Sequence, residues 1–282
     1  MLTKSHAHRP RPRQPLNDMM RATLIAAAAL LVLSGPVRAQ DDAELMGRQV
    51  AEEIDRRDLG FGDSSVDLKM VLSNRQGQTS ERVLRIDTLE VAAAENGDRS
   101  LVVFDEPRDI KGTSFLSFTH ILDPDDQWLY LPALKRVKRI SSANKSGPFM
   151  GSEFAYEDLL SQEVEKYEYR WLRDEPCGDF ECFVVERFPL YKDSGYTRQI
   201  IWVDKAEYRL MQTEFFDRKG DHMKTLVFSD HRQYLDQYWR AHRLDMVNHL
   251  TGKATELAFS DYRFQVGLSE RDFNKKRLER AR

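Results

Sequence analysis

The spacing of apolar residues changes once along the chain. After residue 42 the apolar positions first recur at helical spacing, at Leu45, Met46, Val50 and Ile54. Asp41 and Asp42 stand where an N-cap would be, and Gly60 and Gly62 follow the run. This pattern predicts an amphipathic helix that ends near the two glycines.

Beyond residue 62 apolar and polar residues alternate with a period of two, which is the spacing of β-strands. The strand-like runs cover Val66–Leu72, Thr79–Val91, Ser100–Phe104, Thr113–Ile121, Gln127–Leu131, Arg136–Ile140, Val164–Leu172, Cys182–Pro189, Thr197–Asp204, Arg209–Asp217, Met223–Tyr234, Trp239–Asn248 and Lys253–Val266. Consecutive strands joined by short turns predict an antiparallel meander. About 11–13 strands are enough for a strongly curved, barrel-like sheet.

Two short segments complete a mainly β (α+β) fold. Ser152–Leu160 is amphipathic and predicts a short helix between two strands. Ser269 precedes a basic stretch and predicts the cap of a final helix over Glu270–Arg280. We therefore expect an N-terminal helix, a short middle helix and a C-terminal helix around the sheet.

Residues 1–39 have the features of a signal peptide. Arg21 precedes the apolar run Ala22–Leu33, and Val37 and Ala39 supply apolar or small residues at the −3 and −1 positions of a cleavage site. The apolar run is shorter than the roughly 20 residues that a membrane span needs. A translation start at Met19 or Met20 stays open. We expect cleavage after Ala39, no lipid anchor, and a soluble periplasmic protein with one domain over residues 40–282.

Charge limits the partners of that domain. Residues 1–39 hold six basic residues and one acidic residue, so the remainder keeps 37 Lys and Arg against 45 Asp and Glu, a net charge of −8. Such an acidic body does not suit nucleic acid or a general anionic surface.

The two cysteines agree with an oxidising compartment. Cys177 and Cys182 bracket a four-residue turn between two strand-like runs. A disulfide there would join the hairpin and stabilise it by about 2 kcal/mol, since the closed loop is short. The spacing fits neither the CxxC redox motif nor a common zinc pair.

Motifs of enzymes are absent from the sequence. It contains no GxSxG, HExxH, P-loop or GxGxxG pattern. The histidines after residue 39 form no recognised metal-ligand pair; they are His120, His222, His231, His242 and His249. We expect no catalytic residues, no metal and no cofactor, although a pair of carboxylates that converge in space would leave no trace in the sequence.

Large apolar residues occupy both faces of two neighbouring strands, at Phe115, Leu116, Phe118, Trp128, Leu129, Tyr130 and Leu131. A sheet with one face in water would not show this pattern. Either a helix covers the second face, or that face lines a cavity. The residues alone favour plain core packing against the N-terminal and C-terminal helices, because barrel strands must pack against something.

The segment that follows these strands is basic and then rich in glycine. In Lys135–Arg139 the strand period places Arg136 and Lys138 on one face, where a lipid head group or an acidic partner could bind; a solvated hairpin tip is the alternative. In Ser146–Gly151 the glycines permit bending, and Phe149, Met150 and Phe154 offer soft apolar contacts. This loop is either a lid or an ordinary connector.

The runs WLYLPALKRVKRI and KSGPFMGSEFAYEDL are the most specific parts of the chain. They resemble the periplasmic outer-membrane lipoprotein-sorting proteins, relatives of the lipoprotein carrier LolA and its receptor LolB, and the likeness extends more loosely over residues 40–282. The resemblance implies a half-open barrel with helices across its mouth and acyl chains in between. The residues expected to line that cavity are Phe115, Leu116, Phe118, Trp128, Tyr130, Phe149, Met150 and Phe154.

The resemblance also implies partners. Members of the family look like partners of inner-membrane transporters of the RND/MMPL type, so such a transporter would load the carrier. This chain is longer than LolA and carries the basic hairpin, so a lipid other than a lipoprotein is an equal alternative. A non-carrier periplasmic adaptor with a filled barrel is the rival hypothesis.

Overall fold

The computed structural model describes residues 35–91 and 96–280. The chain divides into two units, residues 1–42 and 43–282, and the fold described below is that of the second unit. Most of the predicted signal peptide, residues 1–34, lies outside the described residues. Helix α2 covers Gly35–Asp58. It begins earlier than the predicted cap at Asp41 and Asp42, because Arg38, Ala39 and Gln40 are themselves strong helix formers.

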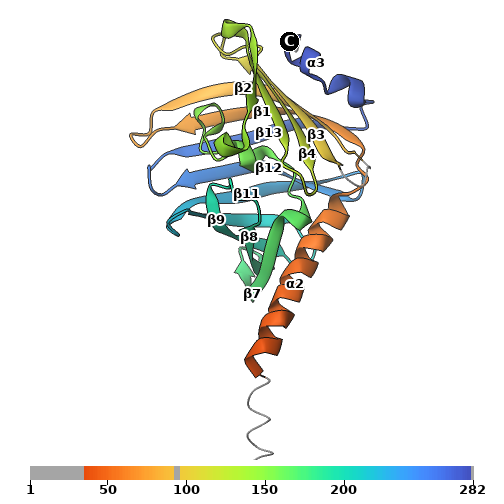
Figure 1. Ribbon diagram of the computed structural model, residues 1–282, viewed down its shortest axis with the longest axis vertical. Helices are drawn as coiled ribbons and strands as arrows, with labels where there is room; N and C mark the ends of the chain where they lie inside the picture. Colours follow the sequence, from red (N-terminus) through yellow and green to blue (C-terminus); the bar gives the residue numbers. More distant parts are fainter. Residues whose placement is uncertain (1–34, 92–95, 281–282) are drawn as a thin grey trace, which may run out of the picture. The chain divides into compact units, whose positions relative to one another are not determined.

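Every predicted strand is present. The described residues form one antiparallel sheet, whose strands are β1 (Asp63–Ser73), β2 (Thr79–Leu89), β3 (Asn96–Glu106), β4 (Ser114–His120), β5 (Asp126–Leu131), β6 (Arg136–Ile140), β7 (Tyr167–Cys177), β8 (Phe180–Pro189), β9 (Tyr196–Asp204), β10 (Leu210–Asp217), β11 (His222–Tyr234), β12 (Tyr238–Asn248) and β13 (Ala254–Phe264). The strand order is β6-β5-β4-β3-β2-β1-β13-β12-β11-β10-β9-β8-β7. The curved sheet does not close, because β6 and β7 are its two edges (Figure 1). This confirms the mainly β, half-open barrel.

The alternation of each strand decides which side chains face the inside of the curve. In β1, Leu68 and Met70 are buried while Lys69 between them is exposed. The register continues this pattern, since Leu68 lies opposite Leu84 of β2 and Met70 lies opposite Leu257 of β13. The inner face of the sheet therefore carries a continuous apolar layer.

Residues 141–166 connect the two edge strands and contain the short 3₁₀ turns η2 (Ser142–Asn144), η3 (Phe149–Gly151), η4 (Tyr156–Leu159) and η5 (Val164–Lys166). We call residues 145–161 the strap, because they pack against the inner face of the sheet. The predicted helix at Ser152–Leu160 is the single turn η4. A bridge between Pro148 and Ala155 folds the start of the strap back on itself.

Helical segments cover parts of both faces. On the inner face, Val50 and Ala51 of α2 pack against Tyr169, Val185 and Ile201 of β7–β9. On the outer face, the C-terminal segment packs on β4 and β5 through Phe273 and Leu278. This segment is two short turns, η6 (Glu270–Asp272) and α3 (Lys275–Leu278), instead of one helix. The Asn274 side chain ends the first turn and caps the second by accepting from the Arg277 N–H.

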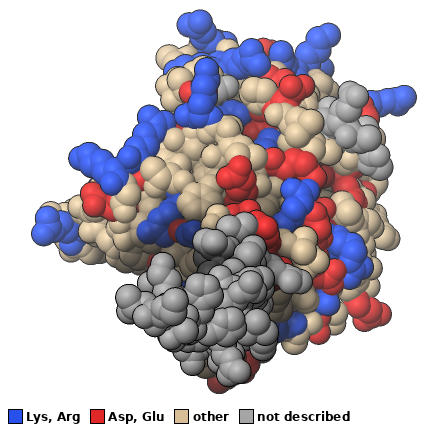
Figure 2. Space-filling view, turned by 60° about the horizontal axis from the view of Figure 1, so that its bottom comes forward, with Lys and Arg blue, Asp and Glu red and all other residues tan. Residues whose placement is uncertain are grey.

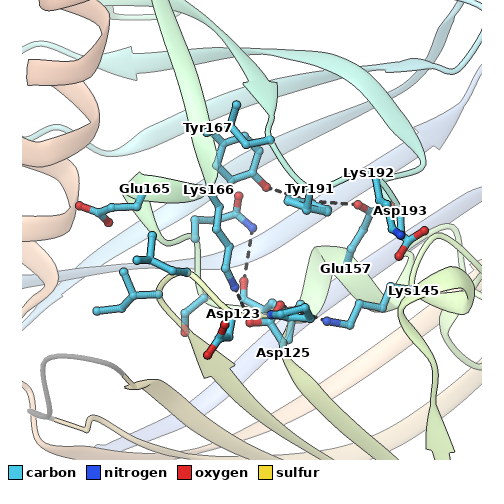
Figure 3. A pocket seen from close by; sticks show the side chains of 17 residues that line it. Asp123, Asp125, Lys145, Glu157, Glu165, Lys166, Tyr167, Tyr191, Lys192 and Asp193 are labelled. Atoms are coloured by element: carbon cyan, nitrogen blue, oxygen red, sulfur yellow. Dashed lines mark hydrogen bonds and ion pairs between the residues drawn. The ribbon is translucent and has the colours of Figure 1, made fainter.

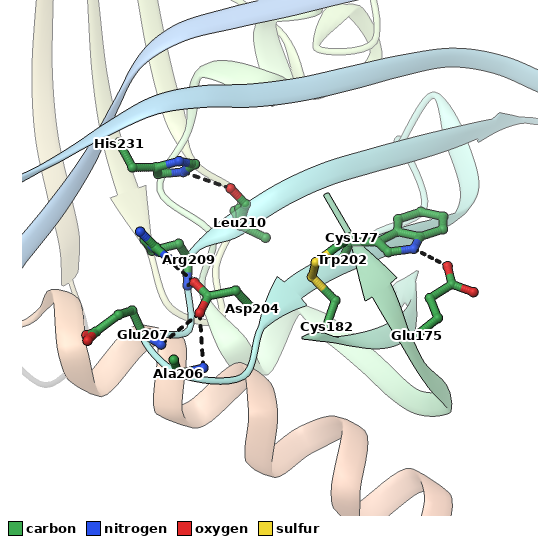
Figure 4. Close-up of a disulfide and its surroundings, with 10 residues drawn as sticks. All are labelled: Glu175, Cys177, Cys182, Trp202, Asp204, Ala206, Glu207, Arg209, Leu210 and His231. Atoms are coloured by element: carbon green, nitrogen blue, oxygen red, sulfur yellow. Dashed lines mark hydrogen bonds and ion pairs between the residues drawn. A yellow bond between two sulfur atoms is a disulfide. The ribbon is translucent and has the colours of Figure 1, made fainter. Parts of the chain in front are cut away.

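The disulfide is present between Cys177 at the end of β7 and Cys182 in β8, with a Cα–Cα distance of 5.8 Å. Figure 4 shows it beside Trp202, whose indole N–H donates to Glu175. Cys182 is fully buried. The next turn is held by Asp204, whose carboxylate accepts from the backbone N–H groups of Ala206 and Glu207. The predicted disulfide is therefore confirmed as a structural bond in the β7–β8 hairpin.

Candidate functional site

A cavity of about 310 Å³ lies between the inner face of the sheet and the strap. Its apolar lining comes from β1, β2, β3, β12, β13 and the strap, and consists of Leu68, Met70, Leu84, Ile86, Val102, Phe149, Phe154, Leu159, Leu160, Leu244, Leu257 and Phe259. Its polar lining consists of Thr88, Asp98, Ser100, Ser117, Thr119, Asp158 and Ser161.

Several of these polar groups are hydrogen-bonded to one another. The hydroxyls of Ser100 and Ser117 lie 2.8 Å apart. Thr119 donates to the Asp98 carbonyl at 2.9 Å, and Ser161 donates to the Asp98 carboxylate at 3.1 Å. The cavity thus offers an aliphatic wall together with a set of hydroxyls and carboxylates from β3, β4 and the strap. Such a lining suits an amphiphile with an apolar chain and a polar head.

Aromatic packing seats the strap against the sheet. The Phe149 ring is fully buried, with centroid distances of 5.8 Å to Phe104, 5.4 Å to Phe115 and 5.5 Å to Tyr156. Aromatic pairs at these distances attract one another beyond their simple area burial. Arg82 of β2 also donates to the Met150 carbonyl. The first half of the strap is therefore fixed to β2, β3 and β4.

A buried ion pair holds the second half. Lys224 of β11 donates to the Asp158 carboxylate at 2.7 Å and to the Glu153 carbonyl at 2.9 Å. The side chains of Lys224 and Asp158 are 1% and 5% exposed. Tyr196 of β9 donates to the same carboxylate at 2.9 Å. Side chains from β9 and β11 therefore both donate hydrogen bonds to the Asp158 carboxylate of the strap.

Glu157 provides another anchor, on the β8–β9 loop. Its carboxylate accepts from the Gly195 N–H at 2.8 Å, the Ser194 hydroxyl at 2.9 Å and the Tyr191 hydroxyl at 3.1 Å. Burial raises the pKa of Glu157, and the neighbouring Asp158 adds to the rise. Gly195 is required here, because a Cβ at this position would lie 2.9 Å from the Glu157 carboxylate.

Two carboxyl groups with raised pKa values, Asp98 and Glu163, lie near the C-terminal end of the strap. Burial raises the pKa of Asp98 to about 6. Burial also raises the pKa of Glu163 to about 7, and the charges of Asp98 and Asp55 add to this rise although Lys166 opposes it. Asp98 and Glu163 therefore titrate near neutral pH, beside the hydroxyl of Ser161 that borders the cavity.

A pocket of about 430 Å³ lies on the other side of the strap, bounded by residues 121–125, the start of β7 and the β8–β9 loop. Figure 3 shows Lys145 and Lys166 both directed at Asp125, and Tyr191 between Tyr167 and Glu157. Leu160 and Ser161 line both this pocket and the inner cavity. These two strap residues therefore separate the inner cavity from an outer vestibule.

A further pocket of about 680 Å³ lies between α2 and strands β11–β13. It shares Leu244 and Phe259 with the inner cavity. Its other residues include Arg57, Tyr208 and Trp239. The inner cavity is thus flanked by one pocket beyond the strap and by another toward α2.

The structure divides the predicted cavity residues between the two faces of the sheet. Phe115, Phe149, Met150 and Phe154 belong to the inner cluster, and of these Phe149 and Phe154 line the cavity. Leu116, Phe118, Trp128 and Tyr130 belong to the outer cluster under Phe273 and Leu278. The C-terminal segment therefore covers the outer face of the sheet at these four residues, which is the first of the two alternatives that the sequence left open. Their contact with a ligand stays a prediction, and their position favours core packing.

The predicted head-group contacts are at the edge of the sheet. In β6, Arg136 and Lys138 are exposed. The register sets Lys138 opposite Leu129 and Arg136 opposite Leu131, and both leucines belong to the inner cluster. Arg136 and Lys138 therefore share the inner face of the sheet, as predicted. Arg139 on the other face forms an ion pair with Asp126.

Sequence reasoning missed most of the cavity lining. Leu68, Leu84, Ile86 and Leu257 sit on regular amphipathic strands, and alternation cannot distinguish a residue that faces a cavity from one that is packed. The pairing of Lys224 with Asp158 was also missed, because 66 residues separate the two. The signal in the sequence is Lys224 itself, which alternates with the apolar residues Leu226 and Phe228.

Among residues 35–91 and 96–280, no group of three or more His, Cys, Asp and Glu side chains is placed to hold a metal ion. No helix in the described part of the chain is long and apolar enough to cross a membrane.

Comparison with known proteins identifies the family. A family model described as "Uncharacterized protein" matches residues 96–280, and no curated protein matches the chain. The crystal structure of an outer membrane lipoprotein-sorting protein domain from Vibrio parahaemolyticus is 55% identical, with a TM-score of 0.81, over 84% of this chain and 99% of that one.

Two other structures agree. A DUF1329 family protein from Desulfovibrio piger is 29% identical, with a TM-score of 0.79 over 84% of this chain and 99% of that one. A LolA superfamily protein from Nitrosomonas europaea is 21% identical, with a TM-score of 0.65 over 82% and 98%, which is a likeness of fold. The chain therefore belongs to the LolA-like family of outer membrane lipoprotein-sorting proteins, as its two motif runs predict.

Proposed function

We propose that the protein is a periplasmic carrier that holds acyl chains of a lipid or lipoprotein in the cavity under the strap. The observation that carries this proposal is the cavity itself, an apolar space of about 310 Å³ with polar groups in its wall. Each methylene buried in such a space contributes about 0.8 kcal/mol. One acyl chain would therefore bind by several kcal/mol without any catalytic group.

The strap is the element that would admit the chain. It separates the inner cavity from the vestibule only at Leu160 and Ser161, while its middle is anchored by Lys224 and Phe149. Opening at this end would break the Ser161–Asp98 hydrogen bond and leave the buried ion pair in place. Such local opening costs less than global unfolding. We expect amide exchange at residues 145–161 to slow when a ligand binds.

The proposed partners rest on the resemblance of the sequence to its family. A carrier needs a donor of lipid, and an inner-membrane transporter of the RND/MMPL type is our proposal for it. The family name and the relative from Vibrio parahaemolyticus support sorting of lipoproteins toward the outer membrane as the wider process. We propose no enzymatic activity.

The test is binding of a fluorescent fatty acid to two matched variants. Ile86→Trp fills the cavity from β2, whereas Val83→Trp adds the same ring to the same strand at a position 37% exposed. We expect wild type and Val83→Trp to bind the probe equally, and Ile86→Trp to lose at least tenfold in affinity. Thermal melting of all three proteins shows whether each one folds.

The adaptor hypothesis gives a different result. If the barrel is merely filled, wild type will not take up the probe, or both tryptophan variants will behave alike. Either outcome would replace the carrier by an interaction module whose surface binds a partner.

A further inference from the structure

The edge strand β6 and the turn before it form a basic, projecting hairpin. Residues 132–140 contain four basic residues and no acidic residue. Lys135, Arg136 and Lys138 are exposed. Of the four, only Arg139 is paired with a carboxylate within 4.0 Å among the described residues. At the tip, Leu134 is 68% exposed between Pro132 and Lys135.

The C-terminal turn α3 carries a second basic group. Lys275, Lys276 and Arg277 are consecutive and exposed, and residues 273–278 contain no acidic residue. Leu278 is fully buried, and its carbonyl accepts from Ser114 of β4 at 2.8 Å. This anchoring fixes the three cations on the outer face of the sheet.

The two basic groups lie at the same end of the sheet (Figure 1), although about 140 residues separate them in the sequence. They project from opposite faces of that end: Arg136 and Lys138 share the inner face with Leu129, whereas α3 packs on the outer face. Lys275 lies 4.4 Å above the ring of Trp128 in β5, and Trp128 is the register partner of Arg139 in β6. Val137 of β6 packs against the same cluster as Phe273 and Leu278. Figure 1 shows α3 beside the end of the sheet that carries this hairpin. We call Lys135, Arg136, Lys138, Lys275, Lys276 and Arg277 the basic edge.

The basic edge contrasts with the acidic remainder of the chain. Charges are screened beyond about 8–10 Å at physiological ionic strength, so a surface that approaches the edge feels these cations more than the distant carboxylates. Figure 2 shows Lys and Arg side chains that project from the rim of one face, with Asp and Glu side chains interspersed among them. The net charge of the chain argues against an anionic partner for the protein as a whole. The basic edge nevertheless allows an anionic partner to bind at this one edge.

We propose that the basic edge docks the protein on an anionic phospholipid surface, with Leu134 entering the head-group layer. Unpaired cations on flexible stems suit mobile phosphate head groups, which need no fixed geometry. An apolar tip among cations suits the boundary between head groups and acyl chains. This surface is separate from the cavity, so the inference goes beyond the carrier function and does not depend on its result.

The experiment is co-sedimentation with vesicles of phosphatidylglycerol and phosphatidylcholine, compared with phosphatidylcholine alone. We expect wild type to bind only the anionic vesicles, and to be released by 0.5 M salt. Each basic residue near an anionic membrane strengthens partitioning by about fivefold, which corresponds to about 1 kcal/mol. The triple variants Lys135→Gln/Arg136→Gln/Lys138→Gln and Lys275→Gln/Lys276→Gln/Arg277→Gln should each weaken binding by about 100-fold.

The control removes the same charge elsewhere. Arg75→Gln/Lys219→Gln/Lys253→Gln changes three exposed residues in the β1–β2, β10–β11 and β12–β13 turns and should leave binding within about threefold. Fatty-acid binding without vesicles should be unchanged in the α3 triple variant and in the control, because none of their residues lines the cavity, and this separates the test from that of the carrier. The proposal is overturned if wild type does not bind anionic vesicles, in which case the edge serves an acidic protein instead. It is also overturned if the control weakens binding as much as the basic-edge variants do.

Discussion

Replacing Lys224 tests whether the strap is held by a buried charge. Lys224→Met keeps an unbranched apolar side chain of nearly the same length, but it removes the ammonium group whose Nζ lies 5.0 and 4.8 Å from the ring centroids of Tyr196 and Phe215. It removes both hydrogen bonds to the strap. Asp158 is then left as a buried carboxylate without its cation.

The expected loss follows from what remains around Asp158. Removing one partner of a buried ion pair costs about 3–5 kcal/mol. Asp158 keeps the Ala155 N–H at 2.7 Å and the Tyr196 hydroxyl at 2.9 Å, so we expect the lower end, about 3 kcal/mol. For a unit of this size about 2–4 °C of Tm is lost per kcal/mol, so Tm should fall by about 6–12 °C.

Chemical denaturation of four proteins measures the coupling: wild type, Lys224→Met, Asp158→Asn, and the double variant. The double variant removes the buried charge entirely, so it should be more stable than Lys224→Met alone. If Lys224→Met costs less than about 1 kcal/mol, or if the two changes are simply additive, the ion pair does not hold the strap.

Three other predictions follow from single features. Phe149→Ala should lower the free energy of unfolding by about 3–5 kcal/mol, because it empties a fully buried ring site; a loss below 1 kcal/mol in urea unfolding would show that the strap does not pack on the sheet. The double variant Cys177→Ala/Cys182→Ala should have a free energy of unfolding about 2 kcal/mol lower than that of wild type. Reductant should lower the free energy of unfolding of wild type by a similar amount and should leave that of the variant unchanged. Because the folded-state pKa values of Asp98 and Glu163 are raised to about 6 and about 7, the folded state binds more protons than the unfolded state above pH 4, and stability should fall as pH rises through 7. Asp98→Asn/Glu163→Gln should flatten this slope in melting curves from pH 5 to pH 8, and an unchanged slope would assign it to other groups.

The strands could be predicted from the sequence because each is set by local alternation. Leu68, Lys69 and Met70 show the period of two directly, and the turn at Asn74–Gly77 ends the run. The C-terminal helix was predicted as too long, because a basic amphipathic stretch does not show that the Asn274 side chain will cap a new turn. Capping of this kind depends on one side-chain rotamer.

The sequence could predict that a cavity for acyl chains exists, but not which residues line it. Leu116 and Phe115 are adjacent, and alternation places them on opposite faces, but only the folded C-terminal segment shows that Phe273 covers Leu116. Likewise, the strap is held by Lys224 and Gly195, which are distant in sequence from Asp158 and Glu157. Long-range pairings of this kind leave no periodic signal. The family resemblance predicted a cavity, and the structure identifies the residues that line it.

Mass spectrometry of lipids extracted from protein purified from the periplasm, without detergent, tests the carrier most directly. We expect wild type and Val83→Trp to carry a lipid with at least one acyl chain in near-stoichiometric amount. We expect Ile86→Trp, folded and purified in the same way, to carry little. Absence of acyl lipid from wild type, or equal amounts in wild type and Ile86→Trp, would contradict the claim that this cavity holds the chain.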